Sequence, residues 1–165
     1  MEGLVTWFTE VMAGSVAKEV VVFVISLMPI LELRGGLLAA KLLGVPLLTA
    51  IPICIAGNII PIPFILLFVR KVFSWLKKFR TFRPMVEKLE KKAMGKSDKL
   101  TKVEFWGLAL FVGIPLPGTG AWTGSLIAAL LEMDIKKAVI AELVGVVIAT
   151  IIMSIVSYGL LGLFF

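Results

Sequence analysis

A pair of short polar interruptions, at corresponding points in two otherwise apolar halves, constrains this chain most. The first runs from Pro29 to Gly36 and contains Glu32 and Arg34. The second runs from Pro115 to Gly124 and is rich in glycine and proline. Each follows an apolar run too short to cross a bilayer and precedes another. Irregular backbone inside lipid is tolerated only where protein buries it or where it lines a wet cavity. Two broken segments in corresponding halves are typical of a transporter's binding site.

Composition places the chain among integral membrane proteins. Hydrophobic residues make up 59% of its 165 residues, whereas soluble proteins contain about 45–50% apolar residues. Leu47–Val69 contains no charged residue, and about 20 apolar residues suffice to span a bilayer. We therefore predict an all-α membrane protein with one domain over residues 1–165, small enough that a homodimer is plausible.

Two residue types important in catalysis and metal binding are scarce or absent. The chain has no histidine and one cysteine, Cys54, which lies within an apolar run. Histidine is the commonest proton shuttle and metal ligand, and a single cysteine cannot form a disulfide within one chain. Glu32 alone does not indicate a particular enzymatic reaction. We therefore expect no metal, no cofactor and no enzymatic activity, and proton coupling would have to use carboxylates.

Positive charge is concentrated in the middle of the chain. Residues 70–104 contain twelve of the 17 Lys and Arg residues and four Asp and Glu residues. An excess of Lys and Arg marks cytoplasmic segments of membrane proteins, so we expect residues 70–102 to be cytoplasmic and to attract anionic lipid headgroups. Nothing besides charge supports nucleic-acid binding, and we expect none.

The order of apolar and polar runs predicts two repeats of one plan. In residues 1–14, apolar and polar side chains fall on opposite sides of a helix, as expected of a helix lying in the membrane interface. Residues 15–69 and 103–165 form the repeats on either side of the basic segment. In each repeat, two short apolar runs joined by a break form a re-entrant helical hairpin, and a long span follows. The short runs are Ala17–Met28 and Leu37–Leu43, then Phe105–Ile114 and Gly124–Leu131; the spans are Leu47–Val69 and Ala138–Phe165.

A shift of 88 positions aligns the two halves. It superposes Pro29 on Pro117, Gly36 on Gly124 and Gly57 on Gly145, among other identities. Because a re-entrant hairpin does not cross the membrane and each span crosses once, the repeats are inverted and both termini lie outside the cell. In the competing interpretation, Phe105–Leu131 is one bent span, which would place Lys136 and Lys137 outside, against the charge bias.

Glu32 and Arg34 are the first candidates for function. Ionisable residues at membrane depth are costly and by default functional; the alternative is an ion pair that only pins the hairpin tip. The planar guanidinium of arginine suits a phosphate or carboxylate, whereas a buried glutamate suits coupling to a proton or cation.

The second break predicts an anion-binding cradle. Glycine permits close backbone approach, and a helix restarting near Thr123 would direct free N–H groups and its positive end inward, facing Arg34. The alternative is a packing turn without a ligand. The predicted substrate-binding residues are Arg34, Gly35, Gly36, Gly118, Thr119, Gly120, Trp122, Thr123 and Asn58.

Two further polar residues lie in the spans. Asn58 would cap backbone groups freed near Pro61, or would line the pathway. Glu142 lies close to Lys137 in the sequence, so we expect it to reach partly towards the cytoplasmic interface. Glu142 joins Glu32 as a predicted ion-coupling residue.

The Glu-Leu-Arg-Gly-Gly run at residues 32–36, the run from Pro115 to Gly124 and the basic middle segment resemble the small multidrug export proteins. That family is distantly similar to the DedA superfamily, whose members are thought to carry two inverted re-entrant hairpins and to move lipids. Some DedA relatives are linked to recycling undecaprenyl phosphate. The resemblance implies a multi-pass protein of the cell membrane.

The sequence thus predicts a transporter or lipid translocase for an amphiphile with an anionic headgroup, such as a polyprenyl or phospholipid phosphate. Arg34 would bind the headgroup, backbone donors around Gly118–Gly124 would assist, and Glu32 would couple a proton or cation. Export of drug-like molecules is the second hypothesis, in which a cationic drug would favour Glu32 and Trp122. A membrane scaffold that transports nothing is the third.

Overall fold

The computed structural model describes residues 17–76 and 98–160, together with the isolated positions Gly3, Thr6, Lys78 and Pro84. Helices, and no strands, occur in this part of the chain. The predicted interfacial helix at residues 1–14 and most of the basic segment lie outside the described residues. The helices are α2 (Lys18–Leu27), α3 (Glu32–Leu42), α4 (Leu47–Ile59), α5 (Pro61–Leu76), α7 (Asp98–Gly113), α8 (Ala121–Leu130) and α9 (Ile135–Ser154), which continues as a π-helix over Ile155–Leu160.

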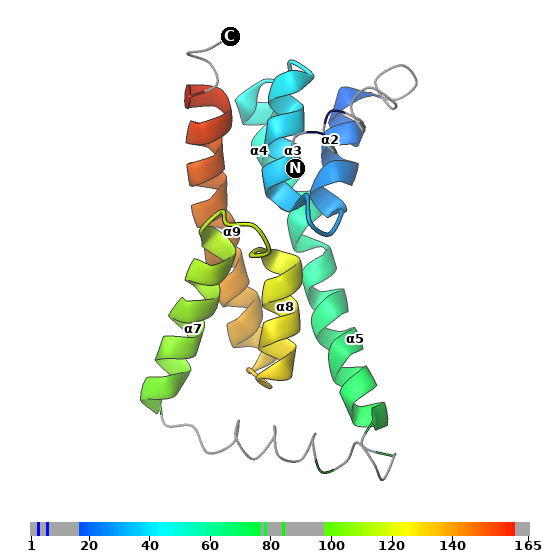
Figure 1. Ribbon diagram of the computed structural model, residues 1–165, viewed down its shortest axis with the longest axis vertical. Coiled ribbons are helices and arrows are strands. Elements are labelled where there is room, and N and C mark those ends of the chain that lie inside the picture. Colours follow the sequence, from blue (N-terminus) through cyan, green and yellow to red (C-terminus); the bar gives the residue numbers. More distant parts are fainter. Residues whose placement is uncertain are drawn as a thin grey trace.

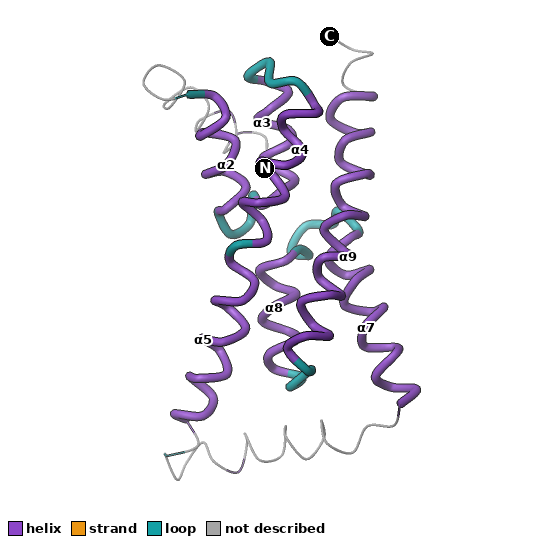
Figure 2. Tube along the Cα trace, turned by 180° about the vertical axis from the view of Figure 1, so that it is seen from behind, coloured by secondary structure: helices purple, strands orange, loops and turns teal. Residues whose placement is uncertain are grey.

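Two helical hairpins point towards each other along the long axis of the molecule. Figure 1 shows α2 and α3 side by side in one half, with their connecting turn near the middle, and α7 and α8 in the other half, with their loop also near the middle. The α4–α5 pair and α9 extend through both halves, as the reverse view in Figure 2 also shows. The connections between the hairpin helices therefore meet halfway along the molecule.

Two helices are long and apolar enough to cross a membrane, as the sequence predicted. They cover Leu47–Val69, with a mean hydropathy of 2.2, and Ile135–Gly159, with a mean hydropathy of 2.6. The first is interrupted at Ile60, between the end of α4 and the start of α5. Pro61 causes this interruption because proline has no N–H to donate and its ring clashes with the preceding turn.

The first break is shorter than predicted. Helix α3 begins at Glu32, so Arg34, Gly35 and Gly36 are helical, and the expectation that the returning helix starts near Leu37 was wrong. The irregular backbone includes the turn before it and its first residue, since Ile30 and Glu32 have φ values of 79° and 49°. Gly36 is required for packing instead, because a Cβ there would overlap the Ser26 hydroxyl on α2 and lie 2.9 Å from the Cys54 sulfur on α4.

The second break is also shorter than predicted. Helix α7 ends at Gly113 and α8 begins at Ala121, so Trp122, Thr123 and Gly124 belong to the helix. The returning helix therefore starts before the predicted restart near Thr123. The non-helical backbone contains Gly118 and Gly120, whose φ values are 81° and 139°. Residues other than glycine rarely adopt positive φ values.

The glycines aligned by the 88-residue shift occupy corresponding packing positions. Gly57 of α4 lies against α2, where a built Cβ would be 2.9 Å from the Phe23 carbonyl oxygen, and Gly145 of α9 lies against α7, 2.7 Å from the Ala109 carbonyl oxygen. Gly124 of α8 packs against Val112 of α7, as Gly36 of α3 packs against α2. Small residues at these crossings let the helix backbones approach closely, which is how helices associate in lipid.

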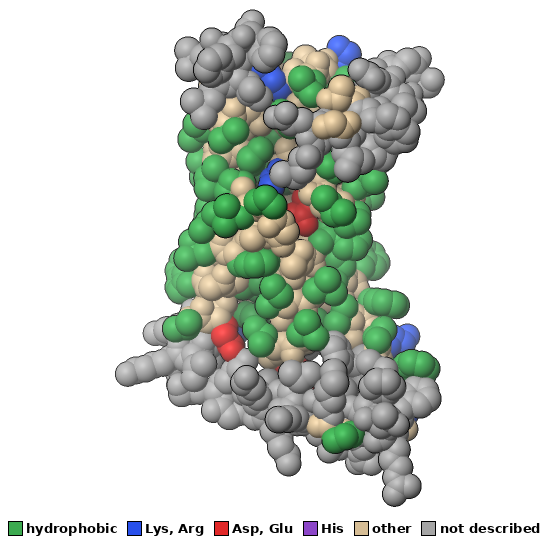
Figure 3. Space-filling view, in the orientation of Figure 1, with side chains coloured by type: hydrophobic (Ala, Val, Ile, Leu, Met, Phe, Trp, Pro, Cys, Tyr) green, Lys and Arg blue, Asp and Glu red, His purple; other side chains and the backbone are tan. Residues whose placement is uncertain are grey.

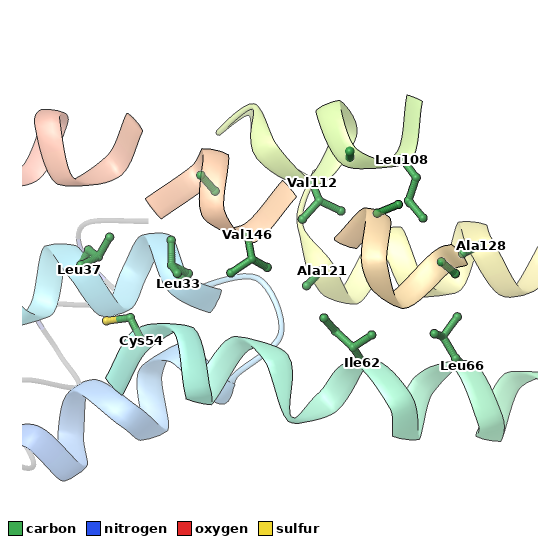
Figure 4. Close-up of a cluster of buried hydrophobic side chains, with 14 of the residues drawn as sticks. Leu33, Leu37, Cys54, Ile62, Leu66, Leu108, Val112, Ala121, Ala128 and Val146 are labelled. Atoms are coloured by element: carbon green, nitrogen blue, oxygen red, sulfur yellow. The ribbon is translucent and has the colours of Figure 1, made fainter. Parts of the chain in front are cut away.

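The buried core is continuous between the two halves. Figure 4 shows Leu33 and Cys54 near one end of the cluster, Leu108 and Ala128 near the other, and Val146 between them. Each of these five side chains is at most 5% exposed. Buried side chains from both halves therefore belong to one cluster.

Candidate functional site

The two polar breaks come together in the middle of the molecule, as the sequence predicted. In Figure 3, acidic and basic side chains lie near each other halfway along a mainly hydrophobic surface. Glu32 and Arg34 at the start of α3 are only 5% and 6% exposed. Their partners all belong to the segment from Ile114 to Trp122, some 80 to 90 residues later in the chain.

Arg34 binds the loop that follows α7. Its guanidinium donates to the carbonyl oxygen of Leu116, to that of Ile114 at 3.2 Å and to the Thr119 hydroxyl at 2.7 Å. Ile114 directly follows the last residue of α7, and Leu116 and Thr119 belong to the loop before α8. Arg34 therefore holds the loop between α7 and α8.

Glu32 binds the start of α8. Its carboxylate accepts from the backbone N–H of Ala121 at 3.2 Å and from that of Trp122 at 3.0 Å. These are among the first N–H groups of the helix, which have no partner within it, and the positive helix end favours an anion. Glu32 is thus an N-terminal cap supplied by a distant part of the chain.

Gly120 makes this cap possible in two ways. Its φ of 139° and ψ of −177° place it in a region that is essentially restricted to glycine. In addition, a Cβ built on Gly120 would overlap the Glu32 carboxylate. We use the term clasp for these contacts of Glu32 and Arg34 with the segment Ile114–Trp122.

The clasp confirms that the two charges face the second break but changes the predicted arrangement. We expected the N–H groups of the restarting helix to face Arg34 across an anion. The N–H groups of Ala121 and Trp122 instead bind Glu32, and Arg34 binds carbonyl oxygens. Sequence reasoning predicted backbone donors around Gly118–Gly124, which include Ala121, but it missed the carbonyl oxygens of Ile114 and Leu116, which their side chains do not signal.

The other predicted binding residues divide into two groups. Thr119, Gly120 and Trp122 lie at the clasp, and the Trp122 indole N–H donates to the Leu27 carbonyl oxygen at 3.2 Å, which ties α8 to the end of α2. Gly35 packs against Leu31 and Ile25, and Gly36 against Ser26 and Cys54; no atom would lie within 4 Å of a Cβ on Gly118. Thr123 is half-buried in the first turn of α8.

Glu142 is fully buried, and the expectation that it reaches towards the interface was wrong. Its side chain is 0% exposed and points to α8, where the Ser125 hydroxyl donates to Oε2 at 2.8 Å. The other oxygen, Oε1, has no hydrogen-bond partner. Lys137, its nearest basic residue in sequence, lies on the exposed side of α9. Ser125 is therefore a site residue that the sequence, which places it within an apolar run, did not signal.

Asn58 lies near the end of α4 and is 3% exposed. It is one helical turn from Cys54, on the same side of the helix. Its Oδ1 atom has no hydrogen-bond partner. Its predicted roles, capping backbone near Pro61 or lining a pathway, stay predictions.

The described residues contain no group of three or more His, Cys, Asp or Glu side chains that could hold a metal ion. The polar groups described above are instead the carboxylates of Glu32 and Glu142, the guanidinium of Arg34, the hydroxyls of Thr119 and Ser125, and backbone donors and acceptors. Such a set can bind an anion, exchange one anion for another, or carry a proton on a carboxylate. It contains no activated nucleophile.

Comparison with known proteins assigns the chain to a family. The family model described as "Putative small multi-drug export protein" matches residues 32–152, which begin at the clasp glutamate, include the long apolar helix Leu47–Val69 and cover most of Ile135–Gly159. No curated protein and no solved structure matched the chain. The distant similarity to the DedA superfamily stays a prediction.

Proposed function

We propose, from the premise that the chain belongs to the small multi-drug export protein family, that it moves an amphiphile with an anionic headgroup across a membrane. A polyprenyl or phospholipid phosphate is the expected substrate class. The observation that carries this proposal is the position of the Glu32 carboxylate, an anion held by the start of α8 next to a buried arginine. We interpret the start of α8 as an anion-binding site, which the Glu32 carboxylate occupies in this structure and a lipid headgroup occupies during transport.

Exchange of the two anions gives a mechanism. A phosphate that replaces the carboxylate would accept from the N–H groups of Ala121 and Trp122, because helix N-termini bind phosphates well. Arg34 would then turn from the carbonyl oxygens of Ile114 and Leu116 to the phosphate, where its planar fork makes two parallel bonds. Both changes open the clasp between the two hairpins, so headgroup binding is linked to a change in their relative position.

The arrangement of helices supports a membrane topology for this mechanism. We propose that each hairpin is re-entrant, that α4–α5 and α9 each cross the membrane once, and that the two halves are inverted repeats. The glycine packing shared by Gly57 and Gly145 supports a duplication. Residues 70–102 would then face the cytoplasm, with both termini outside, and a homodimer could complete the pathway.

Cysteine labelling tests this topology. On a Cys54→Ala background, Leu48→Cys should react with a membrane-impermeant maleimide from outside the cell, and Lys136→Cys only from the cytoplasmic side. Both positions are exposed, so accessibility within the protein does not limit the reaction. Labelling of both cysteines from the same side would refute the inverted arrangement.

Substitution of the two clasp charges tests the mechanism. Arg34→Lys should weaken binding of short-chain phosphatidic acid about ten- to a hundredfold, since losing a hydrogen bond to a charged group costs roughly 1.5–3 kcal/mol and an ammonium lacks the forked geometry. Glu32→Gln should leave phosphatidic acid binding largely intact, because the competing anion is removed. Binding is measured by calorimetry in nanodiscs, with phosphatidylcholine of the same chain length as the control ligand.

The two other functions predict different results. An exporter of cationic drugs, which the family name favours, would bind its ligand through Glu32 and lose binding in Glu32→Gln but keep it in Arg34→Lys. A scaffold would bind neither ligand, and both substitutions would only lower the melting temperature. Wild-type phosphatidic acid binding in both variants would refute the proposed headgroup site.

A further inference from the structure

We propose that Glu142, hydrogen-bonded to Ser125 in the interface between α8 and α9, is the group that carries a proton through the transport cycle. This inference rests on the proposed function and deepens it by separating two roles. Glu32 exchanges with the headgroup, whereas Glu142 takes up and releases the proton. The sequence had assigned ion coupling to both carboxylates without distinguishing them.

The surroundings of Glu142 favour the protonated form. The side chain is 0% exposed, its Oε2 accepts one hydrogen bond from Ser125, and Oε1 accepts none. An ionised carboxylate removed from water needs a cationic partner or several donors. Glu32, by contrast, accepts two backbone N–H bonds at a helix N-terminus. The two carboxylates therefore have environments suited to different protonation states.

The charged groups on the helices packed against α9 strengthen this difference. Among the described residues, the buried charged side chains on those helices are Glu32 and Arg34 of α3; α4 contributes the buried thiol of Cys54, and α5, α7 and α8 contribute no buried charge. Arg34 is engaged with the carbonyl oxygens of Ile114 and Leu116, which follow α7. No described cation therefore compensates an ionised Glu142.

Packing alone does not explain a carboxylate at this position. The 88-residue shift that aligns the two halves superposes Glu142 on Cys54. Each residue packs against an aligned glycine in the second helix of the preceding hairpin. Cys54 lies near Gly36 of α3, and Glu142 lies near Gly124 of α8. A small neutral side chain therefore fills this position in the first half. Glu142 adds a carboxyl group at this position in the second half only.

The proton step is a simple acid dissociation. In the closed clasp, Glu142 carries its proton on one carboxyl oxygen and accepts from Ser125 on the other. When the clasp opens and water reaches the α8–α9 interface, the O–H bond breaks, a water molecule accepts the proton, and the carboxylate remains, now hydrated. Closing the clasp again requires reprotonation. One proton therefore moves per cycle.

Infrared spectroscopy of the protein in nanodiscs tests the protonation state without any substrate. At neutral pH, wild type and Glu32→Gln should both show the carbonyl stretch of a buried protonated carboxyl group, and Glu142→Gln should lose it. Ser125→Ala should shift the band, because its hydrogen bond to the carboxyl group is gone. A spectrum without this band in wild type, or a band that persists in Glu142→Gln, would overturn the proposal.

A second variant covers the case in which Glu142→Gln does not fold. Glu142→Cys copies the residue of the first half, and it should also lack the band while keeping the helical content. If neither variant folds, the Ser125→Ala shift decides: an unshifted band in that variant refutes the assignment to Glu142.

Proton release tests the coupling role separately. Adding short-chain phosphatidic acid to wild type in weakly buffered solution with a pH indicator should release about one proton per protein, and Glu142→Gln or Glu142→Cys should release none. Equal release in wild type and variants would refute the coupling role. If phosphatidic acid does not bind but the infrared band behaves as expected, the headgroup proposal fails and the proton site stands.

Discussion

Gly120→Ala is expected to destabilise the protein strongly and to abolish binding of phosphatidic acid. The backbone at Gly120, with a φ of 139°, costs a residue with a side chain on the order of 1–3 kcal/mol. The added methyl group would also displace the Glu32 carboxylate, whose hydrogen bonds as a charged acceptor are worth roughly 1.5–3 kcal/mol. Because the methyl group would overlap the place that the carboxylate occupies, it would exclude a headgroup from that place as well. The two effects add because the carboxylate cannot move without leaving the start of α8. Thermal unfolding in detergent and calorimetric binding measure the two consequences.

Gly118→Ala provides the matched control. Gly118 also has a positive φ, 81°, but a Cβ there would meet no atom within 4 Å. The substitution therefore carries backbone strain without touching Glu32. If Gly118→Ala and Gly120→Ala lower the melting temperature and the affinity equally, strain alone explains the result, and the clasp has no special role.

Gly145→Ala is expected to be the most destabilising change outside the clasp. A Cβ on this glycine would lie 2.6 Å from the Val112 Cβ and 2.7 Å from the Ala109 carbonyl oxygen. Because one of these atoms is backbone, no rotamer change relieves the overlap, and α7 has to move away from α9. Overpacking of this kind costs about 1–3 kcal/mol, and we expect the upper end of that range, measured by thermal unfolding.

The control for this change lies on α7. A Cβ on Gly107 would meet no atom within 4 Å, so Gly107→Ala should leave stability unchanged or raise it by up to about 1 kcal/mol, the difference in helix propensity. Gly36→Ala gives a graded comparison, since its overlap is with the Ser26 hydroxyl and Ser26→Ala should partly rescue it. A Gly145→Ala protein as stable as wild type would contradict the close α7–α9 packing.

The sequence predicted those parts of the fold that depend on local chemistry. The uncharged run Leu47–Val69 had to form a long apolar helix, and Pro61 had to disturb it. The extent of the breaks depended on tertiary packing instead. Gly36 looked like part of a break because glycine lowers helix propensity. It is helical, and the residue is glycine because the crossing of α3 with α2 and α4 leaves no room for a side chain.

The candidate site was predicted in part for a similar reason. Charged residues are conspicuous within apolar runs, so Glu32 and Arg34 could be recognised as candidates and placed opposite the second break. Their partners are mainly backbone carbonyl and N–H groups, which the sequence does not distinguish from any others. Glu142 was misplaced because proximity to Lys137 in sequence suggested the interface, whereas the packing of α8, through Ser125, covers it.

The clasp also has a consequence for how the chain is made. The partners of Arg34 lie 80 to 85 residues downstream, and synthesis proceeds at about 5–20 residues per second. The first hairpin therefore waits roughly 4 to 17 s, at that rate, before the ribosome has produced the groups that accept hydrogen bonds from its guanidinium. During this interval a nascent half-protein presents to the insertion machinery a guanidinium that lacks these acceptors.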